Sequence, residues 1–465
     1  MDGSQPINPY LSGNFAPVRE ESDFDLAIDG ALPAELAGAF YRNGPNPQFE
    51  PGPDYHWFGG DGMIHAVFVE EGKARYRNRF VQTPKWKLEN AAGRRLFATF
   101  GNPIGSDPSV IGKDGGTANT NIVWHAGRLF ALEEGHPPTD LDPESLETRG
   151  YLQAYGGKVT AHPKIDPLTG EMIWFAYMVG EAGGSPFSPT VSYGVTDKTG
   201  KVIRRDAFEA PYCSMVHDFL VTEKHVLFPI LPLVGSLESV MAGRSPFVWD
   251  PAKGAFVGVM WRDAGVETLK WFEVEPNYVF HPMNAWEVGS RLFADVMEYP
   301  KAPLFPDADG NRSERAPARL VRWTIDLEGN SNQVKREPLD DLPGEFPRVD
   351  DRRACLAYRH GWFAGVAGED FDARFDCLAH VDLKTGKRSL YRFAAGDCPG
   401  EPVFVPRTAD AAEGDGFLVA LVYRGGEDRS DFVVFEAQDV AAGPIASARI
   451  PRRVPFGFHG NWRGA

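Results

Sequence analysis

Four histidines share closely similar sequence surroundings, and they are the residues of this chain best suited to metal chemistry. His162, His217, His281 and His459 each lie among aromatic or β-branched neighbours, beside a Pro, Gly or acidic residue typical of a turn. Imidazole is the commonest nitrogen ligand of first-row metals, and neutral histidines suit iron, zinc and copper. Because the four are scattered over most of the chain, they can act together only if the fold brings them to a common axis.

A rival metal motif begins at His380, which is followed by Val381 and Asp382. A His-x-Asp pair can begin a facial triad of two histidines and one carboxylate. We favour a different interpretation, because Asp382 opens an Asp-Leu-Lys-Thr-Gly stretch typical of a hairpin turn. The chain has no His-Glu-x-x-His motif, no Gly-x-Ser-x-Gly motif and no phosphate-binding loop.

Short strands joined by turns must position these histidines. The chain has 50 glycines and 38 prolines and few helical runs, and near-copies of one turn recur at 166–170, 197–200 and 382–386. A turn repeated behind similar strands predicts repeated antiparallel sheets, as in a β-propeller. We find no Ser/Gly-rich linker, so we expect one all-β propeller domain over residues 1–465.

The net charge limits the possible binding partners, and the cysteine content indicates the cellular compartment. The formal net charge of −16 argues against binding to nucleic acid. Cys213, Cys355, Cys377 and Cys398 form no Cys-x-x-Cys pair, which favours thiols in a reducing compartment. The start of the sequence lacks signal-peptide features, and no apolar run is long enough to span a bilayer. We therefore expect a cytoplasmic protein of unknown oligomeric state.

The segment 228–241 departs from the strand pattern because it is apolar, interrupted by proline and poorly alternating. It is either an insertion that offers an apolar face to a substrate or to a membrane surface, or a buried loop or short helix. Peripheral membrane contact through this segment is therefore one expectation.

Several ordered motifs, spread over nearly the whole chain, resemble those of the carotenoid cleavage oxygenases, a family that includes bacterial stilbene-cleaving and apocarotenoid-cleaving enzymes. The motifs lie at residues 8–15, 41–47, 161–164, 217–219, 281–285 and 457–460. The resemblance implies a seven-bladed β-propeller, in which loops and short helices form a cap over an axial iron site. It also implies Fe(II) ligands at four positions, namely His162, His217, His281 and His459.

Three glutamates fall where the family carries carboxylates behind the ligands: Glu134, Glu345 and Glu401. A metal-bound imidazole has a free N–H, and a carboxylate that accepts it fixes the tautomer and the ring angle. Three such carboxylates would also offset the charge of a dication held only by neutral ligands.

The implied activity is that of a non-haem Fe(II) dioxygenase. It would cleave a conjugated C=C bond of a small apolar alkene with O2 and give two carbonyl products. A non-cleaving isomerase with the same iron site and a non-catalytic binding propeller remain alternatives. A calcium-dependent propeller lactonase would instead carry Asp, Asn and Glu clusters at the axis.

Three positions bear on substrate choice. Stilbene cleavers of the family, as the resemblance implies, grip a phenol with a Tyr and a Lys, and these positions match Phe100 and Glu133 here. Phe58 matches an aromatic residue that stacks near the substrate. A carboxylate at 133 would repel a phenolate, although it can accept a hydrogen bond from a neutral phenol. The substitutions favour an apocarotenoid slightly, with a stilbene, lignostilbene or phenylpropenoid as the alternative.

Overall fold

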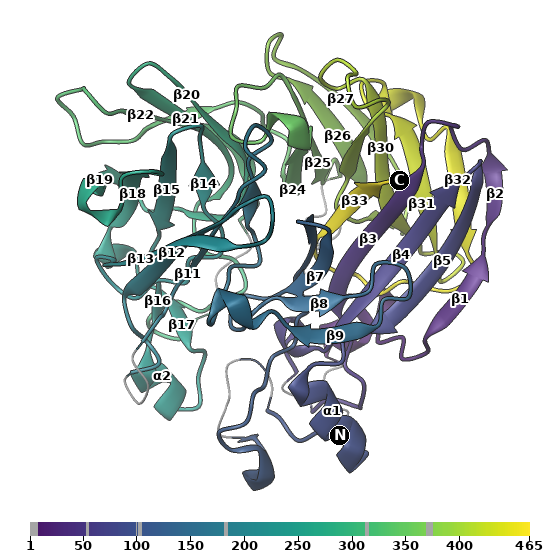
Figure 1. Ribbon diagram of the computed structural model, residues 1–465, viewed down its shortest axis with the longest axis horizontal. Coiled ribbons are helices and arrows are strands. Elements are labelled where there is room, and N and C mark those ends of the chain that lie inside the picture. Colours follow the sequence, from purple (N-terminus) through teal and green to yellow (C-terminus); the bar gives the residue numbers. More distant parts are fainter. Residues whose placement is uncertain are drawn as a thin grey trace.

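The fold is an all-β propeller of seven blades (Figure 1). It comes from a computed structural model that describes residues 8–52, 55–98, 100, 105–180, 185–311, 316–368 and 375–465. Within those residues the strands form seven antiparallel sheets of four or more strands and one two-stranded sheet. The predicted seven-bladed propeller is confirmed.

Blades 2 to 6 are each built from strands that are close in sequence. Blade 2 contains β6 (Asn121–His125), β7 (Arg128–Leu132), β8 (Thr139–Leu141) and β9 (Thr148–Tyr151). Blade 3 contains β10 (Lys164–Ile165), β11 (Met172–Ala176), β12 (Thr190–Thr196) and β13 (Val202–Glu209). Blade 4 contains β14 (Leu220–Val221), β15 (His225–Ile230), β18 (Ala255–Trp261) and β19 (Lys270–Val274). Blade 5 contains β20 (Tyr278–Val288), β21 (Arg291–Tyr299), β22 (Arg319–Asp326) and β23 (Lys335–Pro338). Blade 6 contains β24 (Gly344–Val349), β25 (His360–Gly365), β26 (Cys377–Asp382) and β27 (Lys387–Arg392).

Blades 1 and 7 combine strands from opposite ends of the sequence, and these pairings close the ring (Figure 1). Blade 1 contains β1 (Ser22–Asp25), β5 (Lys73–Phe80), β4 (Gly62–Glu70), β3 (Gly38–Pro45) and β33 (Gly460–Gly464). Blade 7 contains β2 (Ala27–Gly30), β32 (Ala446–Ile450), β31 (Arg429–Glu436), β30 (Gly416–Arg424), β28 (Cys398–Pro399) and β29 (Val403–Pro406). The closing pairs are β3 with β33, in the register Gly38↔Gly464, and β2 with β32.

The recurring Asp turns connect strands as predicted. The Asp166 Oδ1 atom accepts a hydrogen bond from the Leu168 N–H at 2.8 Å, in the turn between β10 and β11. The side chains of Asp197 and Asp382 accept equivalent bonds from the amide two residues later, at 2.9 and 3.0 Å. In each turn the carboxylate satisfies a backbone donor that the sheet leaves unpaired, which explains why Asp begins the repeat.

Helices are few and short. The described residues contain α1 (Pro84–Ala92) and α2 (Leu237–Met241), which lie with the two-stranded sheet β16 (Leu233–Gly235) and β17 (Phe247–Trp249) toward the lower edge of Figure 1. The 3-10 helices within the described residues are η1 (Pro9–Leu11), η2 (Gly13–Phe15), η3 (Trp57–Gly59), η5 (Pro108–Val110), η6 (Gln153–Tyr155), η7 (Pro251–Lys253), η8 (Val266–Thr268), η9 (Asp351–Arg353) and η10 (Val440–Ala442). Across the described part of the chain, the length and hydropathy of every helix fall short of a membrane span.

The apolar segment 228–241 divides into two parts. Its first part continues strand β15 of blade 4, and Phe228, Ile230 and Leu233 are at most 1% exposed. This part is therefore buried, as one of the two interpretations held, but it is a strand instead of a loop or short helix. The sequence did not mark it as a strand because a strand buried on both faces shows no alternation. Its second part forms α2, where Leu237 is 47% and Met241 72% exposed. Membrane contact through α2 stays a prediction.

Candidate metal centre

The four histidines are brought together by the edge strands of four blades. His162 lies just before β10, His217 just before β14 and His459 immediately before β33, while His281 lies within β20. Each of these strands forms one edge of its sheet. In a propeller the blades are arranged around a central axis, so one edge of every sheet faces that axis. This placement explains how residues so far apart in sequence share one site.

The imidazole rings converge through their Nε2 atoms. The Nε2 atom of His217 lies 3.1 Å from that of His162 and 3.2 Å from that of His281. One nitrogen atom from each of the four rings, His459 included, lies within 4.8 Å of all the others, a spacing that can hold a metal ion. The expected convergence of these histidines is confirmed.

Three of the histidines are held from behind by the glutamates that the sequence singled out. The Nδ1 atom of His217 lies 2.5 Å from Glu134 Oε1, and that of His281 lies 2.6 Å from Glu345 Oε2. The equivalent distance from His459 Nδ1 to Glu401 Oε1 is 2.9 Å. When Nδ1–H donates to a carboxylate, the lone pair of Nε2 is left free and points toward the centre.

Burial favours neutral imidazoles at two of the four positions. The pKa of His162 is well below its ordinary value, because burial and the other three histidines oppose the charged form. Burial also lowers the pKa of His281, although Glu345 acts in the opposite direction. His217 differs: burial opposes its charged form, but the Glu134 carboxylate raises its pKa. Neutral rings are the form that metals bind.

Four further residues support the centre and were not predicted. Asp218 Oδ2 lies 3.6 Å from Nδ1 of His162, the histidine without a glutamate, and Asp218 Oδ1 lies 2.7 Å from Lys164 Nζ. The Tyr177 hydroxyl donates to Glu134. Arg348 Nη1 lies 3.3 Å from the Glu401 carboxylate. Lys164, Asp218 and Arg348 lie within three residues of predicted residues in the sequence, and this proximity was the available signal. No neighbouring residue marked Tyr177.

Aromatic side chains surround the histidines. Phe346 stacks on His281, with ring centroids 5.5 Å apart, and lies 5.3 Å from the ring of His459. Phe58, in η3, lies 5.8 Å from Phe458, the neighbour of His459 in sequence. Phe100 packs against Phe58 at 5.4 Å. Phe58 and Phe100 are thus in contact with each other, and Phe58 also contacts the residue that precedes His459.

The carboxylate of Glu133 forms hydrogen bonds and an ion pair with neighbouring side chains and backbone. It accepts hydrogen bonds from Thr117 N at 3.1 Å and Thr117 Oγ1 at 2.8 Å, and it forms an ion pair with His136. Although burial favours the neutral acid, His136 and Thr117 lower the pKa of Glu133, so the carboxylate is ionised. Burial opposes charge on His136, yet Glu133 raises its pKa. The residue at the position of the family lysine is therefore one half of an ion pair.

The rival His-x-Asp motif makes other contacts. His380 Nε2 lies 2.9 Å from His360 Nδ1, and Asp382 binds the guanidinium of Arg359 at 2.7 Å. Asp382 also opens the hairpin between β26 and β27. The turn interpretation of this motif is correct.

The fold and site together define a class: a seven-bladed propeller whose axis carries four histidines, three of them bound to glutamates. Residues 15–464 match the family described as retinal pigment epithelial membrane protein. The chain belongs to this family, which is that of the carotenoid cleavage oxygenases.

Similar proteins within the family carry several names. Isoeugenol monooxygenase of Pseudomonas nitroreducens is 38% identical over 98% of both chains. The crystal structure of Pseudomonas brassicacearum lignostilbene dioxygenase superposes with a TM-score of 0.94 at 36% identity, covering 99% of both chains. A Trp149Ala mutant of Synechocystis apocarotenoid oxygenase gives a TM-score of 0.86 at 29% identity, covering 97% of this chain and 98% of the other.

Proposed function

We propose that the protein is a non-haem Fe(II) dioxygenase that uses O2 to cleave a conjugated C=C bond of a small apolar alkene into two carbonyl products. The main support is that four histidines converge and three of them are hydrogen-bonded to glutamates. Relatives of the chain are also named oxygenases. The complete set argues against a binding propeller that has lost its metal. A histidine set also argues against a calcium-dependent lactonase, since calcium takes oxygen ligands.

The donor set fits iron. His162, His217, His281 and His459 would be the ligands, and imidazole nitrogen suits Fe(II). When bound, Fe(II) supplies the electrons that activate dioxygen for attack on the alkene. The protein's own groups hold each ring at a fixed angle through Glu134, Glu345 and Glu401, whose negative charges offset that of a dication.

We propose Phe58, Phe100 and Glu133 as substrate contacts. Phe58 and Phe100 present ring surface that suits the π-system of a conjugated alkene. Glu133, ionised and bound to His136 and Thr117, can accept a hydrogen bond from a neutral hydroxyl but would repel a phenolate. These features favour a neutral polyene such as an apocarotenoid.

An aryl alkene is the second candidate substrate class. It is supported by the isoeugenol monooxygenase at 38% identity and by the lignostilbene dioxygenase structure at a TM-score of 0.94, against 0.86 for the apocarotenoid oxygenase. A phenylpropenoid or stilbene would bind as the neutral phenol, for the reason given for Glu133.

The test is anaerobic loading with Fe(II), followed by air and one of four alkenes: an apocarotenal, resveratrol, a stilbene without a phenol, or isoeugenol. Mass spectrometry of paired carbonyl products identifies the substrate class. We expect His281→Gln to lose both bound iron and products. His125→Gln is the matched control, because His125 contacts the Gly170 carbonyl at 2.9 Å instead of the centre, and it should retain both. Bound iron without products from any of the four would contradict the proposed cleavage, whereas failure to bind iron would contradict the centre itself.

We also propose that residues 1–465 form one domain of a cytoplasmic protein. The ring-closing pairs β3–β33 and β2–β32 support a single domain, and a sequence without a Cys-x-x-Cys pair supports a reducing compartment. Limited proteolysis that released a stable fragment would contradict the single domain.

A further inference from the structure

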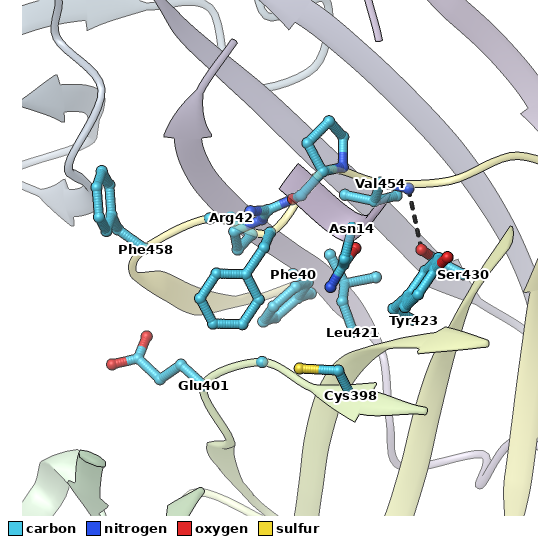
Figure 2. A pocket seen from close by; sticks show the side chains of 14 residues that line it. Asn14, Phe40, Arg42, Cys398, Glu401, Leu421, Tyr423, Ser430, Val454 and Phe458 are labelled. Carbon is cyan, nitrogen blue, oxygen red and sulfur yellow. Dashed lines mark hydrogen bonds between the residues drawn. The ribbon is translucent and has the colours of Figure 1, made fainter. Parts of the chain in front are cut away.

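A small cavity lies at the junction of blades 1 and 7 (Figure 2). Its volume is about 30 Å³, and its lining includes Asn14 from η2, Arg42 from β3 and Ser430 from β31. The segment 455–458, which leads into His459, completes one wall. A buried water needs roughly 10–15 Å³ of such volume, so the cavity has room for one small ion or about two waters.

Arg42 is a buried cation without a counter-charge. The residue is 6% exposed, and its one hydrogen bond to the described residues runs from Nη2 to the Pro455 carbonyl at 2.7 Å. Its Nε–H has no partner, and no carboxylate of the described residues forms an ion pair with it. Burial lowers the pKa of Arg42 to about 10, which leaves the guanidinium charged at neutral pH. Leaving such a charge uncompensated is costly in free energy.

Two other side chains offer hydrogen-bond donors to the same cavity. Asn14 is 5% exposed and its Oδ1 has no partner among the described residues. Its amide group can be turned by 180°, so that Nδ2 donates into the cavity. Ser430 Oγ accepts a hydrogen bond from Val454 N at 2.9 Å, which leaves its hydroxyl hydrogen available. Three donors from three separate segments therefore surround one small space (Figure 2).

No acidic group competes for the guanidinium. Of the described residues that line the cavity, Glu401 is the one carboxylate. Its oxygens are bound to His459 Nδ1 at 2.9 Å and to Gly460 N at 2.7 Å, and in Figure 2 its carboxylate points away from Arg42. A cavity with a fixed positive charge, hydrogen-bond donors and no free carboxylate selects an anion.

We propose that this cavity binds a monovalent anion of about the size of chloride, with Arg42 as its counter-charge and Asn14 and Ser430 as further donors. The bound anion would accept hydrogen bonds from η2, blade 1 and blade 7 and so link these elements where the ring closes. It also fixes the guanidinium that holds Pro455 and packs against Gly457, where an added Cβ would lie 1.4 Å from Arg42 Nη1. The site therefore stabilises the segment that carries His459.

Bromide is the probe, since it resembles chloride and scatters anomalously. Crystals of the full chain, grown without halide and soaked in sodium bromide, should show an anomalous peak beside Arg42 Nε. In solution, bromide should raise the Tm in a saturable manner, whereas sodium gluconate at equal ionic strength should not. A cavity without an anomalous peak, together with equal Tm values in the two salts, would mean that waters fill it and would overturn the proposal.

Variants assign the effect to this cavity. We expect Arg42→Met to abolish the saturable response, and Asn14→Leu, which keeps the side-chain shape, to raise the bromide midpoint. Arg449→Met is the matched control: this arginine lies in β32 of blade 7, is 55% exposed and pairs with Glu427, so the wild-type response should persist. If Arg42→Met does not fold, Asn14→Leu and Ser430→Ala carry the test, and unchanged midpoints in both would refute the site.

Discussion

Replacing Glu401 by glutamine should weaken iron binding by switching the tautomer of His459. The two carboxylate oxygens of Glu401 are used differently: Oε1 accepts from His459 Nδ1 at 2.9 Å, while Oε2 accepts from Gly460 N at 2.7 Å and lies 3.3 Å from Arg348 Nη1. In Glu401→Gln the amide oxygen will face the two donors, which leaves the amide NH2 against His459. The imidazole must then accept at Nδ1 and carry its proton on Nε2, the atom that faces the centre.

Glu345→Gln is the matched comparison, because a single oxygen of Glu345 accepts both the imidazole and the backbone hydrogen bond. Glu345 Oε2 accepts from both His281 Nδ1 at 2.6 Å and Phe346 N at 2.7 Å, so the amide oxygen of glutamine can keep both bonds. Loss of a group that orients a metal ligand costs roughly 10–100-fold in metal affinity, or about 1.4–2.7 kcal/mol. We expect Glu401→Gln to fall in this range and Glu345→Gln to lose clearly less, because only the charge is removed.

The assay is competition for Fe(II) against a chelator of known affinity under anaerobic conditions, with bound iron measured per chain. Denaturation of the iron-free variants controls for folding. Arg348 keeps hydrogen bonds to the Gly460 carbonyl at 2.7 Å and Asn461 Oδ1 at 2.9 Å, so we expect Glu401→Gln to lose only about 1–2 kcal/mol of stability. Equal losses of iron affinity in the two variants, or a larger loss in Glu345→Gln, would refute the tautomer argument.

Two predictions concern stability. Burial, followed by Arg42, holds the pKa of His65 well below 6.5, so the unfolded chain binds more protons and stability is lost as the pH falls below about 6.5. His65→Gln should therefore flatten the dependence of the unfolding free energy on pH, by up to about 1.4 kcal/mol per pH unit in denaturant titrations, and parallel curves would contradict this. An added Cβ at Gly194 would lie 2.2 Å from the buried Trp174 ring, so Gly194→Ala should destabilise the protein by about 1–3 kcal/mol or more. Gly464→Ala, where a Cβ meets nothing within 4 Å, is its control, and equal denaturation midpoints would show that blade 3 accommodates the methyl group.

Local sequence patterns were enough for part of the fold and the site. The Asp turns at 166–170 and 382–386 could be predicted because each turn is satisfied within a few residues by its own side chain. The four histidines could be grouped because their neighbours were alike. The glutamates could not be found by pattern alone: an isolated Glu345 resembles any surface carboxylate, and only the family likeness marked it.

Other features depend on contacts that no local pattern records. Asp218 follows His217 in sequence but approaches His162, because adjacent residues of an extended chain point in opposite directions. Residues 228–230 were not predicted to belong to a strand, because β15 (His225–Ile230) is buried on both faces and contains Pro229. The pairing of β33 with β3 joins residues at opposite ends of the sequence, and nothing in either strand specifies the other.

That pairing also sets an order of events during protein synthesis. The chain leaves the ribosome N-terminus first, so β3 emerges early. It then lacks its edge partner β33 while the other six blades are synthesised. His459 and β33 are adjacent, so the segment that closes the ring also delivers one of the four imidazoles. A nascent chain can therefore neither seal the propeller nor complete its metal centre until that segment has left the exit tunnel. Binding of a metal ion by all four imidazoles would in this way be confined to chains whose residues 459–464 have left the ribosome.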